Sequence, residues 1–429
     1  MEVTIFGTIC FLLIFVLLIR QVNPLLAAVF FAPFCASAVI QADFFYLQPG
    51  HFFLFLTMIC SLVKGRVKIH MPNGMVFGFI LFALLTIIIS AVFRIDVLVY
   101  GIGNRIQLKS SLVSLQNFTQ YAYIVLGFIL YWMVYNYSIQ DMKNWRRIVN
   151  IFAKSGITVL CIGVYQIIAN NYSLPFDEVF RNSVRDMWQT KERVQGTFGE
   201  ASFMGQFCVY LFAVFSTYKW HKSGVIRITG IALTMLIGVL TRSSGFLLGI
   251  IAVAFIWLFL QKLSLKTLIQ VLMLAIVAVL AGWFVIRLPS VQVILDNAYS
   301  KYTLQSWSGI ERNTVFWHML MVGRKYPISG IGYGGGRSTD LYANLFSTTG
   351  IVGFALFFGF IMQKVYQLFR VYGYTKEEQM GILLVVAILV TSISVPDIAY
   401  LPIWVIFGLL DGLTAHKTRT KALSNHRIT

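Results

Sequence analysis

The sequence is poor in charged residues, and above all in acidic ones. Of its 429 residues 12% are charged and 16 are Asp or Glu, whereas 58% are hydrophobic and the mean hydropathy is +0.78. Soluble domains carry about 25% charged residues, so this composition excludes an ordinary soluble protein. The apolar residues form runs of membrane length, which predict spanning helices because backbone groups in lipid must be hydrogen-bonded within their own segment.

Motifs for metal or cofactor binding are also missing. The cysteines lie in apolar runs without a Cys-x-x-Cys pair, at Cys10, Cys35, Cys60, Cys161 and Cys208. Glu200, Glu311 and Asp340 are too far apart in sequence to be assigned as ligands of one metal ion. The stretch GIGYGG at 330–335 matches the dinucleotide-binding pattern by chance, because no strand–turn–helix pattern surrounds it. We therefore expect no disulfide, no metal and no other cofactor.

The apolar runs predict an all-α polytopic membrane protein, a single membrane domain over residues 1–429 with about 12–13 transmembrane helices. The candidate spans are 3–19, 25–40, 50–63, 75–93, 118–137, 148–169, 201–219, 225–241, 244–260, 267–287, 344–369, 380–394 and 398–413. The first run lacks the basic segment and the cleavage site of a signal peptide, so we expect a retained helix.

The net charge of +18 predicts orientation rather than nucleic-acid binding. Basic residues gather on alternate connections, which is the positive-inside pattern. These clusters are Arg20, 64–68, 143–147, 219–227, 262–266, 370–376 and 417–421. We therefore place this side in the cytoplasm, with residues 416–429 as a disordered basic tail at the cytoplasmic membrane surface. The loops 94–117, 170–200 and 288–343 then share the outer, periplasmic or extracellular face.

The two longer of these outer loops carry arginines where the charge rule would not favour them. They are Arg181, Arg185 and Arg193 in the first, and Arg312, Arg324 and Arg337 in the second. Arginine binds phosphate and carboxylate through a planar fork, and Tyr and Trp residues flank these positions. The pattern favours a cavity for an anionic, sugar-bearing ligand at the outer membrane surface. The alternative is an interfacial belt of aromatic residues with snorkelling arginines.

A glycine-rich stretch interrupts the apolar pattern at 327–353. Four glycines, at 332, 334, 335 and 336, come directly before Arg337, and Asp340 and Asn344 follow. Glycine lets the backbone approach a ligand closely and take a positive φ, and the adjacent arginine suits an anion. The simpler interpretation is a turn that caps the next helix.

A second turn, RVQGTFGEAS at 193–202, leads directly into the apolar run from 201. It places Glu200 near the N-terminus of a predicted helix, where the helix dipole favours a carboxylate. Glu200 is therefore either a capping acid or a positioned general base.

Taken in order, five motifs resemble the O-antigen polymerase and ligase superfamily of bacterial polysaccharide assembly. The motifs are RVQGTFGEAS at 193–202, LTRSSG at 240–245, ERN at 311–313, YPISGIGYG at 326–334, and Asn344 with GIVG at 350–353. The resemblance is concentrated in residues 193–355, and the N-terminal third shares only its hydropathy with that superfamily.

The resemblance implies a metal-independent glycosyltransferase that uses an undecaprenyl-diphosphate-linked glycan as donor. By position, Arg193 and Arg312 match the family arginines that hold the donor diphosphate, and Glu200 is the candidate base. The other candidate substrate-binding residues are Arg242, Glu311, Tyr333, Arg337, Asp340 and Asn344. The expected partners are lipid-linked repeat units, a flippase and a chain-length regulator.

Two departures from the family pattern bear on this assignment. Family members often read Thr-x-Ser-Arg where this chain has Thr241-Arg242-Ser243-Ser244, so the role of Arg242 stays open. The ligase branch has His-Asn where this chain has Ala343-Asn344, which favours a polymerase. The alternatives are an O-antigen ligase acting on lipid A–core and a lipid-linked oligosaccharide flippase. We disfavour the flippase because charges lie in the outer loops and no internal repeat is visible.

Overall fold

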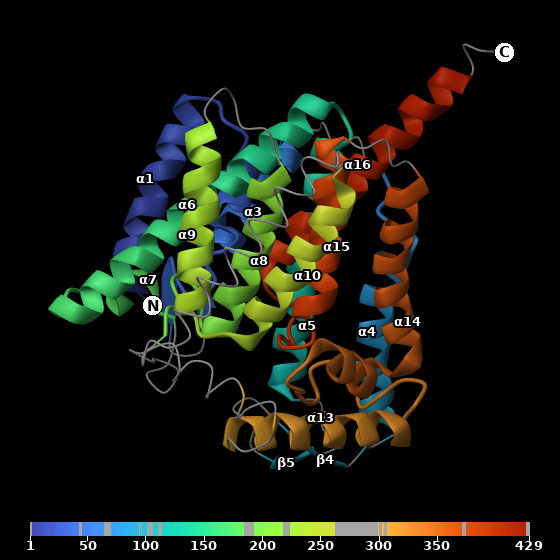
Figure 1. Ribbon diagram of the computed structural model, residues 1–429. Coiled ribbons are helices and arrows are strands. Elements are labelled where there is room, and N and C mark those ends of the chain that lie inside the picture. Colours follow the sequence, from blue (N-terminus) through green and yellow to red (C-terminus); the bar gives the residue numbers. More distant parts are fainter. Residues whose placement is uncertain are drawn as a thin grey trace.

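The computed structural model describes most of the chain. The described residues are 2–42, 45–63, 70–93, 95, 97–100, 106–109, 114–183, 193–217, 224–261, 299, 303, 307–370 and 375–425. Within them the protein is a bundle of helices with two small sheets (Figure 1). The predicted span 267–287 lies outside the described residues.

The long helices run up and down through the bundle. They are α1 (Ile5–Ile19), α3 (Pro49–Val63), α4 (Gly74–Val92), α5 (Leu115–Ser138), α6 (Met142–Tyr172), α8 (Ala201–Thr217), α9 (Gly224–Leu240), α10 (Ser244–Leu260), α14 (Leu341–Arg370), α15 (Lys376–Thr391) and α16 (Leu401–Asn425). By length and composition α4, α5, α6 and α14 suffice to cross a membrane, and α1, α3, α8, α9 and α10 are apolar but shorter. The expectation of a mainly helical membrane protein is thereby confirmed, while the full number of spans stays a prediction.

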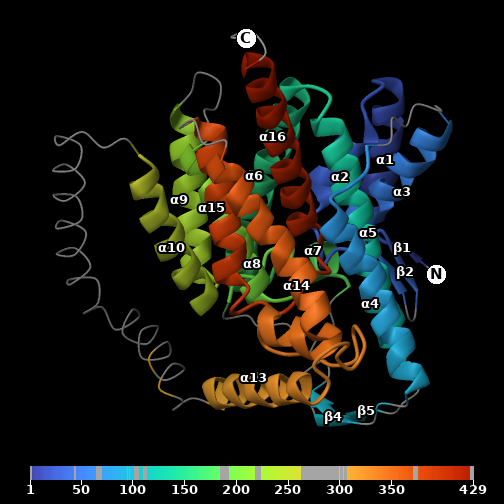
Figure 2. The ribbon, with the colours of Figure 1, turned by 90° about the vertical axis from the view of Figure 1, so that its right-hand side faces the viewer.

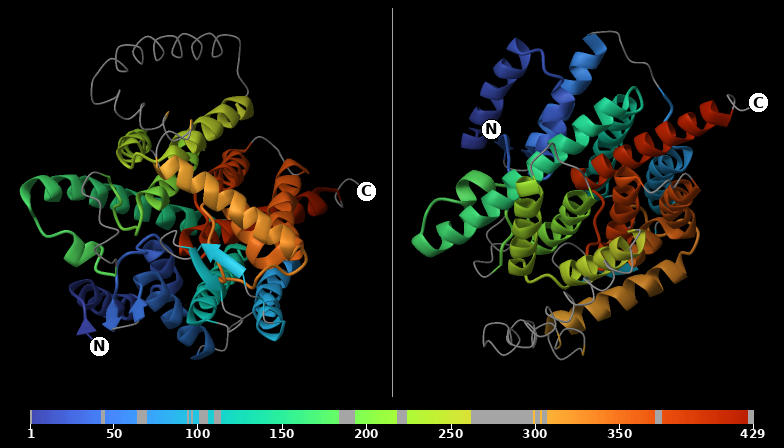
Figure 3. Two further views of the ribbon diagram at one scale, coloured as in Figure 1. Left: turned by 90° about the horizontal axis from the view of Figure 1, so that it is seen from below. Right: turned by 45° about the horizontal axis from the view of Figure 1, so that its top comes forward.

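The remaining elements are short or lie across the bundle. Strands β1 (Glu2–Val3), β2 (Ile40–Ala42) and β3 (Phe45–Leu47) form an antiparallel sheet in that order, and β4 (Val97–Tyr100) pairs with β5 (Ile106–Lys109). The short helices are α2 (Pro24–Phe31) and α7 (Asp177–Phe180), and the 19-residue α13 (Trp307–Lys325) lies across the bundle. Helix α13 and the β4–β5 pair lie at the end of the bundle opposite the C-terminus (Figures 1 and 2), and from below α13 crosses that end (Figure 3).

Two segments differ from the sequence expectation. The predicted span 25–40 contains only the eight-residue α2, which Asn23 caps by accepting a hydrogen bond from Leu25 N at 3.0 Å. The helix ends at Phe31: Ala32 still has helical dihedral angles, but Pro33 has no backbone N–H to continue the hydrogen-bond ladder, and the chain then turns into β2.

The expected disordered tail at 416–429 is helical up to Asn425, where the described chain ends. His416 Nε2 lies 2.7 Å from the carbonyl oxygen of Ser138, and Lys417 pairs with Glu378 at 2.8 Å. These contacts hold α16 against α5 and α15, so the basic residues prolong a packed helix.

Glycines allow α16 to approach α5 closely. A Cβ at Gly127 would lie 2.3 Å from the indole nitrogen of Trp404, and one at Gly408 would lie 2.8 Å from the carbonyl oxygen of Tyr131. Small residues at such crossings increase the van der Waals contact that holds membrane helices together.

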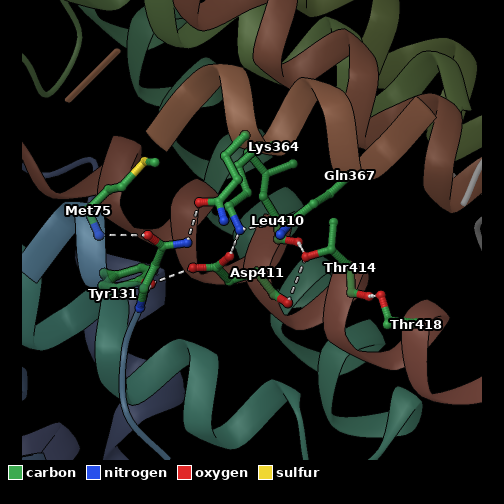
Figure 4. A network of polar contacts seen from close by, with 10 residues as sticks. Met75, Tyr131, Lys364, Gln367, Leu410, Asp411, Thr414 and Thr418 are labelled. Carbon is green, nitrogen blue, oxygen red and sulfur yellow. Dashed lines mark hydrogen bonds and ion pairs between the residues drawn. The ribbon is translucent and has the colours of Figure 1, made fainter. Parts of the chain in front are cut away.

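An ion pair lies inside the bundle, away from the outer loops. Lys364 of α14 pairs with Asp411 of α16, and the two side chains are 2% and 8% exposed. Lys364 also donates to Gln367 Oε1 at 2.8 Å, and the hydroxyl of Tyr131 donates to Asp411 (Figure 4). The expectation that the charges keep to the loops is wrong for this pair: both residues lie within predicted spans, 344–369 and 398–413, and the packing of α14 against α16 brings them together.

Candidate functional site

Arg193 opens the turn before α8 and is tied to the end of α9. Its Nε donates to the carbonyl oxygen of Thr241 at 2.9 Å, and the next residue, Val194, donates its backbone N–H to the carbonyl oxygen of Leu240 at 3.1 Å. The guanidinium is therefore fixed beside the connection between α9 and α10.

Side chains from elsewhere hold the Gly-Thr-Phe-Gly turn that follows. Gln166 of α6 accepts from the backbone N–H groups of Gln195 and Gly196 at 2.9 and 2.8 Å, and Gly196 has a φ of +57°. Arg181, 1% exposed, donates to the carbonyl oxygens of Phe198 and Gly199 at 3.3 and 3.4 Å. Sequence reasoning placed Arg181 among candidate ligand-binding arginines, whereas these bonds make it a support for the turn.

Charged side chains from three parts of the chain gather around Arg193. Burial lowers the pKa of Arg193, the positive Arg312 lowers it further, Glu200 raises it, and Arg242 lowers it. Arginine nevertheless stays protonated in proteins. Arg193 therefore interacts with two other guanidinium groups and one carboxylate, and an anion bound beside it would relieve the repulsion among the arginines.

Arg242 takes part in this group with an unusual backbone. It follows the end of α9 with a φ of +49°, in the left-handed region that costs a non-glycine residue about 1–3 kcal/mol. Its N–H donates to the carbonyl oxygen of Val239 at 2.9 Å. This turn carries the guanidinium to the side of the bundle where Arg193 lies.

Glu200 joins the arginine group to the glycine-rich stretch. Its Oε1 lies 3.7 Å from Arg337 Nη2, and its Oε2 accepts from the hydroxyl of Ser202 at 3.2 Å. The side chains of Glu200 and Arg337 are 35% and 22% exposed. The two arginine-bearing segments, 193–200 and 307–343, therefore meet at one end of the bundle.

The glycines before Arg337 allow the loop to pack against helices. Gly334 has a φ of +73°, and a Cβ there would lie 3.1 Å from Asn117 Cα of α5. Between two such glycines, Tyr333 donates its N–H to Thr86 Oγ1 of α4 at 3.1 Å and accepts from Asn117 Nδ2 at 2.7 Å. Contacts with α4 and α5 thus hold the loop that carries Arg337, and its glycines allow this close packing.

Asp340 and Asn344 have clear structural contacts. Asp340 caps α14, accepting from Ala343 N and from the hydroxyl of Ser338, both at 2.8 Å. Burial raises the pKa of Asp340, and these hydrogen bonds act against the rise. Asn344 donates to the carbonyl oxygen of Pro396 at 2.9 Å, which ties α14 to the α15–α16 connection. Glu311 lies partly buried on α13, one residue before Arg312.

A cavity of about 330 Å³ opens beside Glu200 and Arg337. Its described lining residues are Cys35, Gln48, Gln120, Tyr123, Ser183, Phe198, Gly199, Glu200, Phe203, Arg337, Asp397, Ala399 and Tyr400. A smaller hollow shares Gln120, Arg337 and Asp397 with it and reaches Tyr333 and Asn344.

Asp397 is the site residue that sequence reasoning missed. It lies between α15 and α16, and its Oδ1 accepts from the N–H of Ala399 at 2.8 Å. The sequence feature that could have revealed it is a single acidic residue directly after Pro396 in an apolar stretch.

The arrangement combines a group of arginines with a cavity that two carboxylates line. Among the described residues, no three His, Cys, Asp or Glu side chains gather as metal ligands would. No protein-family model matches the chain, and no curated protein matches its sequence.

Proposed function

We propose that the chain polymerises a bacterial surface polysaccharide, an O-antigen, capsule or exopolysaccharide. The glycan on one undecaprenyl diphosphate is transferred to the terminal sugar of a repeat unit on another, at the outer side of the cytoplasmic membrane. The observation that carries the proposal is the gathering of Arg242, Arg312 and the carboxylate of Glu200 around Arg193, whose guanidinium is held by the carbonyl oxygen of Thr241. The motif resemblance over 193–355 supplies the substrate class.

In this reaction a hydroxyl oxygen of the acceptor sugar bonds to the anomeric carbon of the donor sugar. The bond from that carbon to the diphosphate oxygen breaks, and its electron pair leaves with undecaprenyl diphosphate. Arginines fixed beside the departing group stabilise the developing charge, which is the usual form of electrostatic catalysis. Glu200 interacts with Arg193 and lines the cavity, so it takes the proton of the attacking hydroxyl.

One structural observation bears on each of the two alternative functions, the ligase and the flippase. The ligase branch has a histidine where this chain has the buried Ala343 at the start of α14, which favours the polymerase. The buried Lys364–Asp411 pair is a feature that a transporter would use, since charges inside a membrane bundle often mark a substrate or ion path. A flippase for lipid-linked sugars is therefore the second candidate.

A deletion strain separates the three functions, with the wild-type gene returned as the control. For the polymerase, single repeat units still reach the final acceptor while long chains disappear from gels. Undecaprenyl-linked polymer that accumulates unattached would identify a ligase. Lipid-linked repeat units that stay inaccessible to a periplasmic glycosidase would identify a flippase. Either of the last two results contradicts the proposal.

A further inference from the structure

The cavity and the arginine group beside it have opposite charge. Among the described lining residues the charged side chains are Glu200, Asp397 and Arg337, which leaves a formal charge of −1. Arg193, Arg242 and Arg312 do not line the cavity, yet Arg193 and Glu200 interact electrostatically. The site thus has a positive and a negative compartment, and Glu200 belongs to both.

The walls of the cavity have the composition of a small-molecule site. Phe198 and Phe203 each contact the ring of Tyr400, with centroids 6.4 and 5.5 Å apart, and form a packed aromatic wall. Gln48 and Gln120 add carboxamides from other elements. A volume of about 330 Å³ is at the lower end of the range for ligand pockets, about 300–1,000 Å³.

We propose that this cavity binds the terminal sugar of the acceptor, and that the sugar is uncharged or carries an amino group. The inference rests on the proposed function and divides its site in two. A diphosphate is repelled by a compartment of net negative charge and attracted by the arginine group. Sugar hydroxyls, in contrast, are good donors to the carboxylates of Glu200 and Asp397, and the N–H of Ala399 fixes the orientation of Asp397.

The division predicts that filling the cavity blocks the acceptor and spares the donor. Ala399 lines the cavity, so Ala399→Phe reduces its volume. Ile393→Phe is the matched control, because Ile393 is 55% exposed and belongs to the same α15–α16 connection. Asp397→Asn is a second variant that keeps the shape of the cavity and removes one charge.

Two measurements are made on each full-length variant. Polymer length is read from gels of cells with matched membrane abundance, and the affinity for farnesyl diphosphate, a short soluble prenyl diphosphate, is measured on detergent-purified protein. We expect Ala399→Phe and Asp397→Asn to form at least tenfold less long polymer. Their affinity for farnesyl diphosphate should stay within about twofold of wild type, as for Ile393→Phe.

The possible failures are distinguishable. Wild-type polymer from both cavity variants, or an equal loss of farnesyl diphosphate affinity in them, overturns the acceptor assignment and leaves the arginine clamp intact. Failure of wild-type protein to bind farnesyl diphosphate, or unchanged binding in Arg193→Ala, removes the clamp and so the proposed function. If Ala399→Phe does not reach the membrane, Asp397→Asn decides.

Discussion

Arginines of similar appearance in the sequence have different surroundings in the structure. Arg181 is buried, pairs with Asp177 at 3.1 Å and bonds to two carbonyl oxygens of the turn before α8. Arg193 is only partly buried and lies among like charges, Arg242 and Arg312. Hydrogen bonds to a charged group contribute about 1.5–3 kcal/mol, so Arg181 stabilises the turn. The repulsion around Arg193 supports its proposed role in binding an anion.

Substitution of Arg193 and Arg312 tests the diphosphate clamp. Lysine keeps the charge and loses the planar fork, so Arg193→Lys and Arg312→Lys should both abolish long chains. Removal of one such contact raises the barrier by about 2.7–4 kcal/mol, at least a hundredfold in rate. Gels of polymer length are compared with immunoblots of membrane protein.

Arg324→Lys is the control for these variants, since Arg324 is an exposed residue in the last turn of the same helix as Arg312. It should polymerise normally. Full-length polymer from both Arg193→Lys and Arg312→Lys would leave no bidentate clamp at these positions.

Among the elements, the glycine-rich loop positions Arg337 by packing between α4, α5 and α14. At Gly334 an alanine would keep an unfavourable φ of +73° and approach Asn117, at a cost of about 1–3 kcal/mol. We expect Gly334→Ala to shorten the polymer and to lower the thermal stability of the purified protein. Gly74→Ala is the control, because no atom lies within 4 Å of a Cβ there. Unchanged polymer and stability would show that the loop tolerates displacement.

The buried Lys364–Asp411 pair gives a second prediction, which concerns the contact between α14 and α16. Lys364→Met leaves Asp411 charged and buried without its partner, a change that typically costs about 3–5 kcal/mol. The double variant Lys364→Met/Asp411→Leu removes both charges and should recover most of the stability. Thermal unfolding in detergent measures both effects.

Measuring polymer synthesis distinguishes a stabilising role of the Lys364–Asp411 pair from a role in transport. Long chains made by the stable double variant would mean that the pair stabilises the bundle. Loss of export with normal stability would support the flippase instead. A single variant as stable as wild type contradicts the packing argument.

For the whole molecule, the prediction is that the arginine-bearing end faces outward. Asn171, near the end of α6, and Thr314, on α13, are both exposed, so each is replaced by a single cysteine. In a cysteine-free background an impermeant maleimide should modify both in intact cells whose outer membrane is permeabilised. Thr418→Cys, exposed near the opposite end, should react only after lysis. Protection of Asn171→Cys or Thr314→Cys would place this end in the cytoplasm.

The sequence by itself determined the class of the protein and most of its helices, because hydropathy is a local property that each segment carries. It failed at 25–40, where Pro33 and a hairpin end the helix, and at 416–425, where contacts with α5 and α15 extend α16. It also named most of the charged site residues, since a polar residue within apolar surroundings is visible without a fold.

Tertiary structure decided which of those residues share a site. Arg193, Arg242 and Arg312 are separated by 49 and 70 positions, and only the packing of α8, α9 and α13 at one end brings Arg242 and Arg312 into interaction with Arg193. The same packing turned Asp340 into a helix cap and added Asp397 to the cavity. These assignments depend on long-range contacts, which no local pattern of residues encodes.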